Sequence, residues 1–205
     1  MNPLRILVLA GAVVAGAASY ARFARPKVLN WGATSEDVAR TMPGDDILPD
    51  AAMQTTRCIT IDATPDRIWP WLVQMGGGAR AGAYTYDWIE RRLGIDIKNS
   101  DRILPEFQKL EVGEFLALND KGTGIEVREV VPNHHLVLQW APTRSTWTFG
   151  LYPVSDGRTR LVSRNRLPRS GPLFWPMMLA FMEPGSLVME RKMLLGIKER
   201  VERSE

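Results

Sequence analysis

The sequence ends in a helical pattern that needs a partner surface. Residues 185–202 carry four apolar residues at every fourth position, namely Met189, Met193, Ile197 and Val201. This spacing places the apolar side chains on one stripe of an α-helix, which must be buried against another element. The charged residues of this stretch, Glu190 among them, fall largely outside the stripe. The chain ahead of this helix must therefore supply a complementary apolar surface.

That surface is predicted to be an antiparallel sheet. In residues 57–62 polar and apolar residues alternate, so Ile59 and Ile61 share one face of a strand. Further strand patterns follow one another with short turns, and Gly157 lies in the turn before the last of them. They cover residues 114–118, 124–131, 135–140, 146–153 and 160–165. Short connections favour a meander of antiparallel strands over crossovers.

Two short helices are expected between the first strand and the others. Thr64 can cap the first, Pro65 suits its first position, and a run of three glycines from Gly76 ends it. The second covers residues 85–93, with Gly94 as its C-terminal cap. This order of elements predicts an α+β domain in which the C-terminal helix covers the concave face of the sheet.

The N-terminus has a different character. Residues 6–20 contain no charge and are apolar on every face, and Arg5 precedes them while Arg22, Arg25 and Lys27 follow. The pattern predicts a membrane-inserting helix through residues 4–23, either an uncleaved anchor or a cleaved signal peptide. The basic residues after the apolar stretch favour the anchor, and their excess favours a cytoplasmic main domain. We therefore expect a single-pass protein of the cell membrane, with secretion after cleavage as the alternative.

Three segments follow from this reading. Residues 1–25 form the anchor or signal segment, residues 26–55 a linker that packs on the domain, and residues 56–205 the globular domain. A length of 205 residues suits one domain of ordinary size. Oligomeric state is not indicated by the sequence.

Charge and composition exclude several classes of function. The net charge is +3, but four basic residues and no acid precede Thr34, which leaves about −1 for the rest. A nearly neutral domain lacks the clustered cations of a nucleic-acid partner, so none is expected. Cys58 is the only cysteine, and the only histidines, His134 and His135, are adjacent and point to opposite faces of a strand. We therefore predict no metal site and no cofactor.

The order of elements and several motifs resemble a known superfamily. The segment ITIDATPDRIWPWLVQMG is similar to the opening strand and helix of the SRPBCC superfamily, the START and Bet v 1-like helix-grip fold that includes polyketide cyclase- and dehydrase-like proteins. More narrowly, NWGATSEDV, GAYTYDWIERRLGIDIKNSDRILPEFQ and VMERKMLLGIKERVE resemble an actinobacterial-type subgroup of undefined activity. The resemblance covers about residues 30–202. It implies a cavity between the sheet and the last helix that binds a hydrophobic or amphipathic molecule.

Candidate ligand-binding residues come from three places in the chain. Strand alternation gives two apolar faces, and methionines of the last helix can adapt to ligands of varied shape. An aromatic and polar cluster follows the glycine-rich GGGARAG, and a carboxylate at the start of the last helix could face the cavity with a raised pKa. The candidates are Tyr84, Tyr86, Trp88, Leu138, Trp140, Trp147, Phe149, Glu183, Met189 and Met193. For each of them the simpler alternative is a plain core residue or a solvated charge, and Asp87 and Glu90 are expected to be solvated helix charges.

Three functions are compatible with this pattern. The first is a membrane-tethered carrier or sensor of a lipid, isoprenoid or polyketide-like molecule. The second is a cyclase or dehydratase in which Glu183, Asp87 or a tyrosine steers proton transfer in the same cavity. The third is a scaffold whose core is filled. No set of nucleophile, base and orienting residue stands out, so no catalytic residue is assigned and binding is favoured.

Overall fold

The computed structural model describes residues 18–95, 97–119, 121–140 and 143–203, together with residues 5, 11, 15 and 16. The first named element is a π-helical turn, Tyr20–Ala24, that continues into helix α2 (Arg25–Leu29). Helix α3 (Ser35–Ala39) and strand β1 (Met53–Ile61) follow, and then helices α4 (Pro65–Val73) and α5 (Asp87–Arg92). The remaining strands are β2 (Phe115–Ala117), β3 (Gly124–Val131), β4 (His135–Trp140), β5 (Thr146–Pro153) and β6 (Thr159–Leu167). Helix α6 (Phe174–Met177), a π-helical turn at Met178–Met182 and helix α7 (Glu183–Arg203) complete the described chain.

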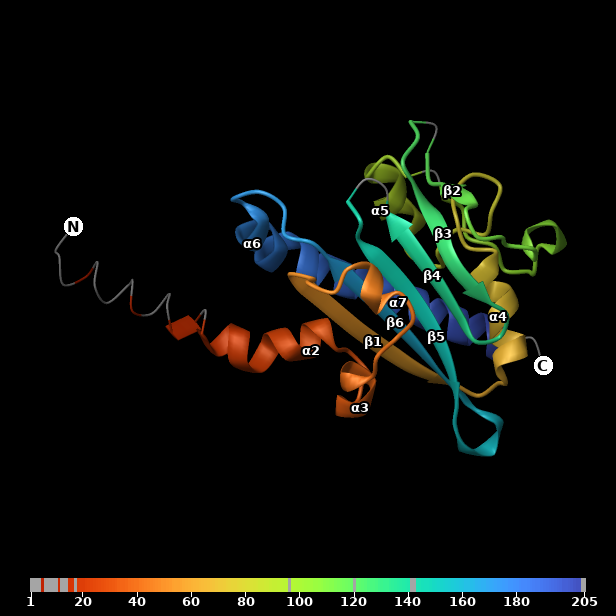
Figure 1. The fold of residues 1–205 in the computed structure, drawn as a ribbon, viewed down its shortest axis with the longest axis horizontal. Helices are drawn as coiled ribbons and strands as arrows, with labels where there is room; N and C mark the ends of the chain where they lie inside the picture. The colour runs from red at the N-terminus through yellow and green to blue at the C-terminus, as the bar shows by residue number, and fades with distance from the viewer. Residues whose placement is uncertain are drawn as a thin grey trace.

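The six described strands form one antiparallel sheet in the order β1-β6-β5-β4-β3-β2. Strands β2 to β6 are a meander, as the short connections predict, while β1 joins the sheet beside the last strand. The sheet bends around helix α7, which crosses its concave face (Figure 1). The prediction of an α+β domain with a curved antiparallel sheet and a long C-terminal helix is confirmed.

The core lies between the concave face and the helices. Ile68 and Leu72 of α4, Leu136 of β4 and Leu194 and Ile197 of α7 are all buried and belong to one apolar cluster. Their contacts follow from the sequence periodicities, because a spacing of three or four in a helix and of two in a strand each keep one face apolar. Helix α7 is therefore held to the sheet along the apolar stripe that its sequence predicts.

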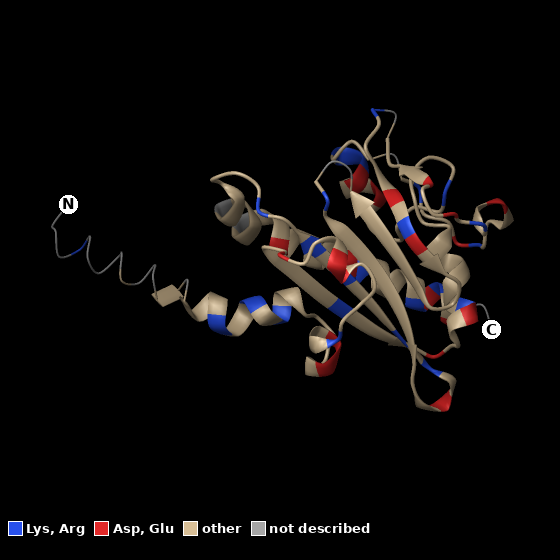
Figure 2. Ribbon diagram, in the orientation of Figure 1, with Lys and Arg blue, Asp and Glu red and all other residues tan. Residues whose placement is uncertain are grey.

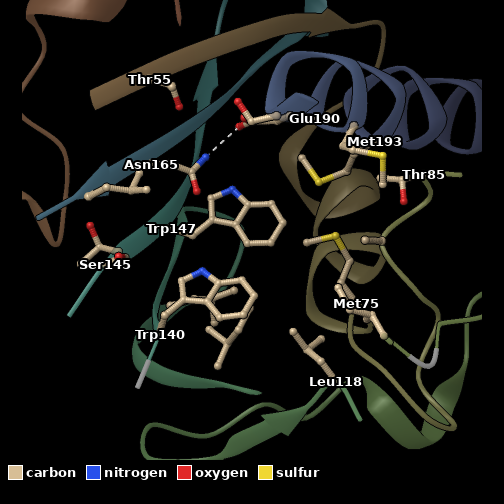
Figure 3. Close-up of a pocket in the computed structure, with 18 of the residues that line it drawn as sticks. Thr55, Met75, Thr85, Leu118, Trp140, Ser145, Trp147, Asn165, Glu190 and Met193 are labelled. Carbon is tan, nitrogen blue, oxygen red and sulfur yellow. Dashed lines mark hydrogen bonds between the residues drawn. The ribbon is translucent and has the colours of Figure 1, made fainter. Parts of the chain in front are cut away.

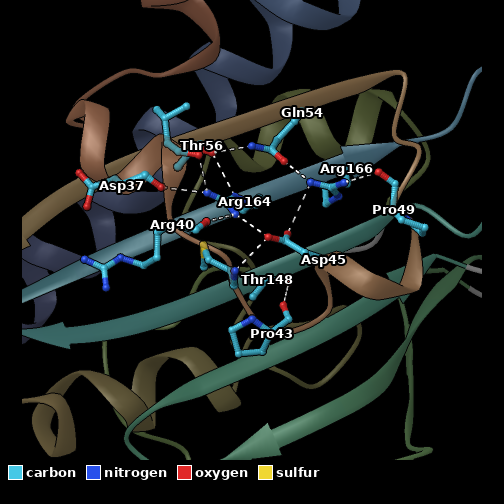
Figure 4. A network of polar contacts seen from close by, with 12 residues as sticks. Asp37, Arg40, Pro43, Asp45, Pro49, Gln54, Thr56, Thr148, Arg164 and Arg166 are labelled. Carbon is cyan, nitrogen blue, oxygen red and sulfur yellow. Dashed lines mark hydrogen bonds and ion pairs between the residues drawn. The ribbon is translucent and has the colours of Figure 1, made fainter.

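Residues 37–49 lie against the opposite face of the sheet. Helix α3 begins with a capping box in which Thr34 and Asp37 satisfy each other's backbone N–H groups. Arg164 of β6 donates to the carboxylate of Asp45 at 2.7 Å and to the carbonyl oxygen of Arg40 at 2.7 Å (Figure 4). Arg166, on the same face, donates to the carbonyl oxygen of Pro49 at 2.9 Å. These contacts close the outer side of the sheet without a second layer of regular structure.

Charges are mixed over most of the ribbon. Figure 2 shows Lys and Arg interspersed with Asp and Glu on the sheet and on α7, whereas Arg22, Arg25 and Lys27 make the N-terminal helical segment purely basic.

The predicted membrane anchor and the single-pass location are not supported. Across the described ranges, no helix combines the length and the apolar character that a membrane crossing requires. The continuously described helical segment starts at residue 18 and already carries Arg22, Arg25 and Lys27, which is unlike a membrane span. Much of the predicted anchor at 4–23, namely residues 4, 6–10, 12–14 and 17, lies outside the described residues.

Candidate functional site

A cavity of about 630 Å³ lies between the concave face of the sheet and helices α4, α5 and α7. Its wall is mostly apolar and includes Leu72, Ile125 and Leu138. Met75 and Leu118 also belong to it (Figure 3). Ligand pockets for small molecules have volumes of about 300–1,000 Å³ and combine apolar walls with a few polar groups. The helix therefore covers the sheet without filling the space beneath it.

Five of the predicted ligand-binding residues line this cavity. They are Leu138 and Trp140 of β4, Trp147 of β5, and Met189 and Met193 of α7. Trp147 is fixed within the wall, because its indole N–H donates to the hydroxyl of Ser163 on the neighbouring strand at 2.9 Å. Its ring presents an apolar surface to the interior while its polar atom is satisfied.

Four other predicted residues lie elsewhere. Tyr84 is buried in the core, where its hydroxyl donates to the carbonyl oxygen of Trp71 at 2.8 Å and its backbone is left-handed, with φ 57°. Phe149 is also buried in the core. Tyr86 and Trp88 are exposed. None of the four is among the cavity-lining residues, so a role in binding stays a prediction for them.

Glu183 has a partner outside the cavity. Its carboxylate is fully buried and accepts hydrogen bonds from Nε and Nη2 of Arg25 at 2.9 and 2.7 Å. This pairing joins helix α2 to the first turn of α7. The prediction that Glu183 faces the cavity is not met. Its carboxylate instead forms a structural ion pair with Arg25, and Glu183 is not among the residues that line the cavity.

A polar network that the sequence analysis missed forms part of the cavity wall. Glu190 of α7 pairs with Arg57 of β1, and its other oxygen accepts from Ser163 and from Asn165, the latter at 3.2 Å. Burial raises the pKa of Glu190, and the Arg57 charge and the three hydrogen bonds oppose that shift. Both oxygens of Glu190 are therefore engaged by the protein itself.

One sequence signal could have located this ion pair. Arg57 has the same parity in its strand as Ile59 and Ile61, so alternation alone places it on the apolar face. A buried arginine requires a carboxylate partner, because an unpaired buried charge is very costly. The partner, Glu190, follows the cavity-lining Met189 and lies at the border of the helical stripe.

A second carboxylate lines the cavity from helix α5. Glu90 is 5% exposed, and one of its oxygens accepts a hydrogen bond from the hydroxyl of Thr85. Burial raises the pKa of Glu90, the Thr85 hydrogen bond lowers it, and the charge of Asp87 raises it further. The expectation that Glu90 is a solvated helix charge is wrong, because α5 turns this side chain toward the cavity.

The described residues hold no group of three or more His, Cys, Asp or Glu side chains arranged for a metal ion. His135 instead contacts the carboxylate of Glu129 through Nε2 at 2.8 Å. The expectation that His134 and His135 point to opposite faces is wrong, because His134 precedes β4 and the two rings meet edge to face. These side chains lie at the β3–β4 hairpin and are not among the cavity-lining residues.

The strand order, the two helices after β1, and the cavity under α7 decide the architecture. The domain has a helix-grip fold. In this fold the sheet and the last helix enclose the internal space, so the core and the cavity wall share residues. The narrower resemblance to one subgroup stays a prediction.

Comparisons with known proteins give distant structural likenesses. No protein-family model matches the chain, and no curated protein matches it in sequence. A START superfamily protein from Mycobacterium smegmatis is 12% identical, with a TM-score of 0.46, over 74% of this chain and 99% of its own. A protein from Mesorhizobium loti is 20% identical, with a TM-score of 0.44, over 75% and 99% of the two chains. The Aha1 protein from Colwellia psychrerythraea is 18% identical, with a TM-score of 0.44, over 73% and 96%. At these values no activity transfers to this chain.

Proposed function

We propose that this protein binds a hydrophobic or amphipathic small molecule, of the lipid, isoprenoid or polyketide-like class, in the cavity under helix α7, as its carrier or sensor. The observation that carries the proposal is the cavity itself, with a volume of about 630 Å³ and a largely apolar wall. Burial of apolar ligand surface is worth about 25 cal/mol per Å², which suits such a wall. Met189 and Met193 suit ligands of varied shape, because methionine repacks easily.

Carriage or sensing is favoured over catalysis by the state of the buried acids. A cyclase or dehydratase needs an acid or base that reaches the ligand. Both oxygens of Glu190 are engaged by Arg57, Ser163 and Asn165, and Glu183 is paired with Arg25 outside the cavity. Glu90 keeps one unengaged oxygen in the cavity wall, and its other oxygen accepts from the Thr85 hydroxyl, but no third side chain among the described residues orients this pair, as covalent catalysis requires.

The test fills the cavity and leaves the surface otherwise intact. Met189→Trp in the full chain adds a large ring to the cavity wall, whereas Val188→Trp adds the same ring at the adjacent, exposed position of α7. Binding of the apolar dye Nile red, followed by its fluorescence, should weaken at least tenfold in Met189→Trp and stay unchanged in Val188→Trp. Native mass spectrometry of the purified chain should in addition reveal a bound lipid-like mass. Nile red that binds both variants equally well, with no copurifying mass, would contradict the proposal.

A further inference from the structure

Two buried oxygen atoms of the cavity wall have no hydrogen-bond partner within the described part of the chain. They are Oε2 of Glu90 and Oγ1 of Thr55. The Glu90 and Thr55 residues are 5% and 1% exposed. Roughly nine in ten buried polar groups in proteins are hydrogen-bonded, and a buried group without a partner is costly. Each oxygen is therefore a position where a bound molecule can supply the missing partner.

The Glu90 side chain is held in place for this contact. Its Oε1 accepts from the Thr85 hydroxyl, which fixes the carboxylate while Oε2 stays unengaged. An ionised carboxylate is an acceptor only, so the complementary ligand group is a hydrogen-bond donor such as a hydroxyl or an amine. Hydrogen bonds to a charged acceptor are stronger than neutral ones, most of all where water is excluded.

Thr55 lies on the other side of the cavity. It is the direct cross-strand neighbour of Asn165, which belongs to the Glu190 network. Figure 3 shows Thr55 and Thr85 on opposite sides of the cavity with the Trp147 ring between them, and Thr85 marks the position of its partner Glu90. The cavity thus has an apolar middle and one unsatisfied polar position on each side.

We infer that the ligand is a molecule with an apolar middle and a polar group at each end, and that its donor group pairs with Glu90 while its other end meets the Thr55 hydroxyl. This inference rests on the proposed function and names its ligand class. A simple hydrocarbon would leave both oxygens without a partner, and a molecule with one polar end would leave one of them so.

Two probes of equal chain length test the inference in the full-length protein. The probes are dodecanediol, with a hydroxyl at each end, and dodecanol, with one hydroxyl. Each competes with Nile red for the protein, and its Kd is compared between variants. Glu90→Met removes the carboxylate at similar side-chain length and should weaken dodecanediol binding about tenfold, as expected for a lost hydrogen bond to a charged group. Glu106→Met is the matched control, because Glu106 is exposed and lies outside the cavity. It should leave both Kd values unchanged.

Thr55→Val keeps the inference testable if Glu90→Met fails to fold. The substitution is nearly isosteric and breaks no hydrogen bond within the described chain, so the Tm should not fall. Dodecanediol should bind about fivefold more weakly to Thr55→Val. The affinity for dodecanol should change less, because its single hydroxyl can still pair with Glu90. If both variants bind dodecanediol as tightly as the natural chain does, the inference is wrong and the proposed function stands. If neither Nile red nor either probe binds the natural chain, the proposed function fails and the inference fails with it.

Discussion

Arg57 of strand β1 and Glu190 of helix α7 form an ion pair inside the wall of the cavity, although they are 133 residues apart in the chain. Arg57 also donates to the hydroxyl of Ser186 at 3.0 Å and to the carbonyl oxygen of Val28 at 3.2 Å. One guanidinium group therefore ties together the first strand, the last helix and helix α2. Removal of either partner leaves an uncompensated charge in the interior.

Replacement of Arg57 by Met should lower the free energy of unfolding by about 3–5 kcal/mol, because Glu190 would stay buried without its cation. The double variant Arg57→Met, Glu190→Leu should recover most of that loss, since a well-packed apolar pair often replaces a buried ion pair at little cost. Urea unfolding followed by circular dichroism measures both. Arg128→Met, which breaks the exposed pair with Glu126, should change stability by less than about 1 kcal/mol. A double variant as unstable as the single one would contradict this account.

Acid should weaken the attachment of helix α3 to the sheet. Although burial opposes it, hydrogen bonds from Arg160 and Thr34 lower the pKa of Asp37 to about 2, below its ordinary value of 3.8. A carboxyl group whose folded-state pKa is lowered stabilises the fold above its ordinary pKa, and that contribution is lost as the pH falls from about 4 to about 2. The free energy of unfolding should drop by about 1–2 kcal/mol over this range for this reason. Asp37→Asn should be less stable at neutral pH and less sensitive to acid in the same range, and equal acid sensitivity of both proteins would argue against the assignment.

Cys58 should be chemically silent in the folded protein. Burial, with a further contribution from the Asp37 charge, raises the pKa of its thiol to about 12, and only the thiolate reacts with disulfide reagents. An aromatic disulfide reagent at neutral pH should therefore release almost no thiolate from the native chain and one equivalent after unfolding in urea. Ser155→Cys places a second thiol at an exposed position and should react promptly while folded. Fast reaction of Cys58 in the native chain would contradict its buried position.

Local periodicity was sufficient to predict most of the elements. The alternation in β4 and β5 and the spacing of four in α7 are properties of neighbouring residues, so the two apolar walls of the cavity, with Trp140, Trp147 and Met193, could be predicted. The pairing of β1 with β6 could not, because it joins segments about a hundred residues apart and no local pattern encodes it.

The polar part of the site depends on such long-range contacts. Glu190 looks like a solvent-facing charge within its own helix, and only Arg57 of β1 explains its burial. Tyr84 belongs to an aromatic cluster in sequence, but its left-handed backbone accompanies a ring buried in the core, apart from Tyr86 and Trp88. Glu90 occupies a short helix whose orientation over the cavity is fixed by the rest of the fold. Charges and irregular backbone were therefore the features that the sequence pattern predicted least well.

The segment before residue 30 should contribute to stability through Arg25. The carboxylate of Glu183 is fully buried, and Arg25 engages it through two nitrogens, while the Tyr20 hydroxyl lies 3.5 Å from its second oxygen. Arg25→Met should lower the free energy of unfolding by about 3 kcal/mol, because the buried carboxylate would lose its cation.

A matched control for Arg25→Met lies in the same segment. Arg22 is exposed, and its guanidinium lies over the neighbouring Phe23 ring, so Arg22→Met should cost less than about 1 kcal/mol. In the Glu183→Gln background the effect of Arg25→Met should shrink, since a neutral amide has less need of a cation. Urea unfolding of the four proteins gives the coupling between the two positions. Additive effects would mean that the N-terminal helical segment is not anchored to α7 through this pair.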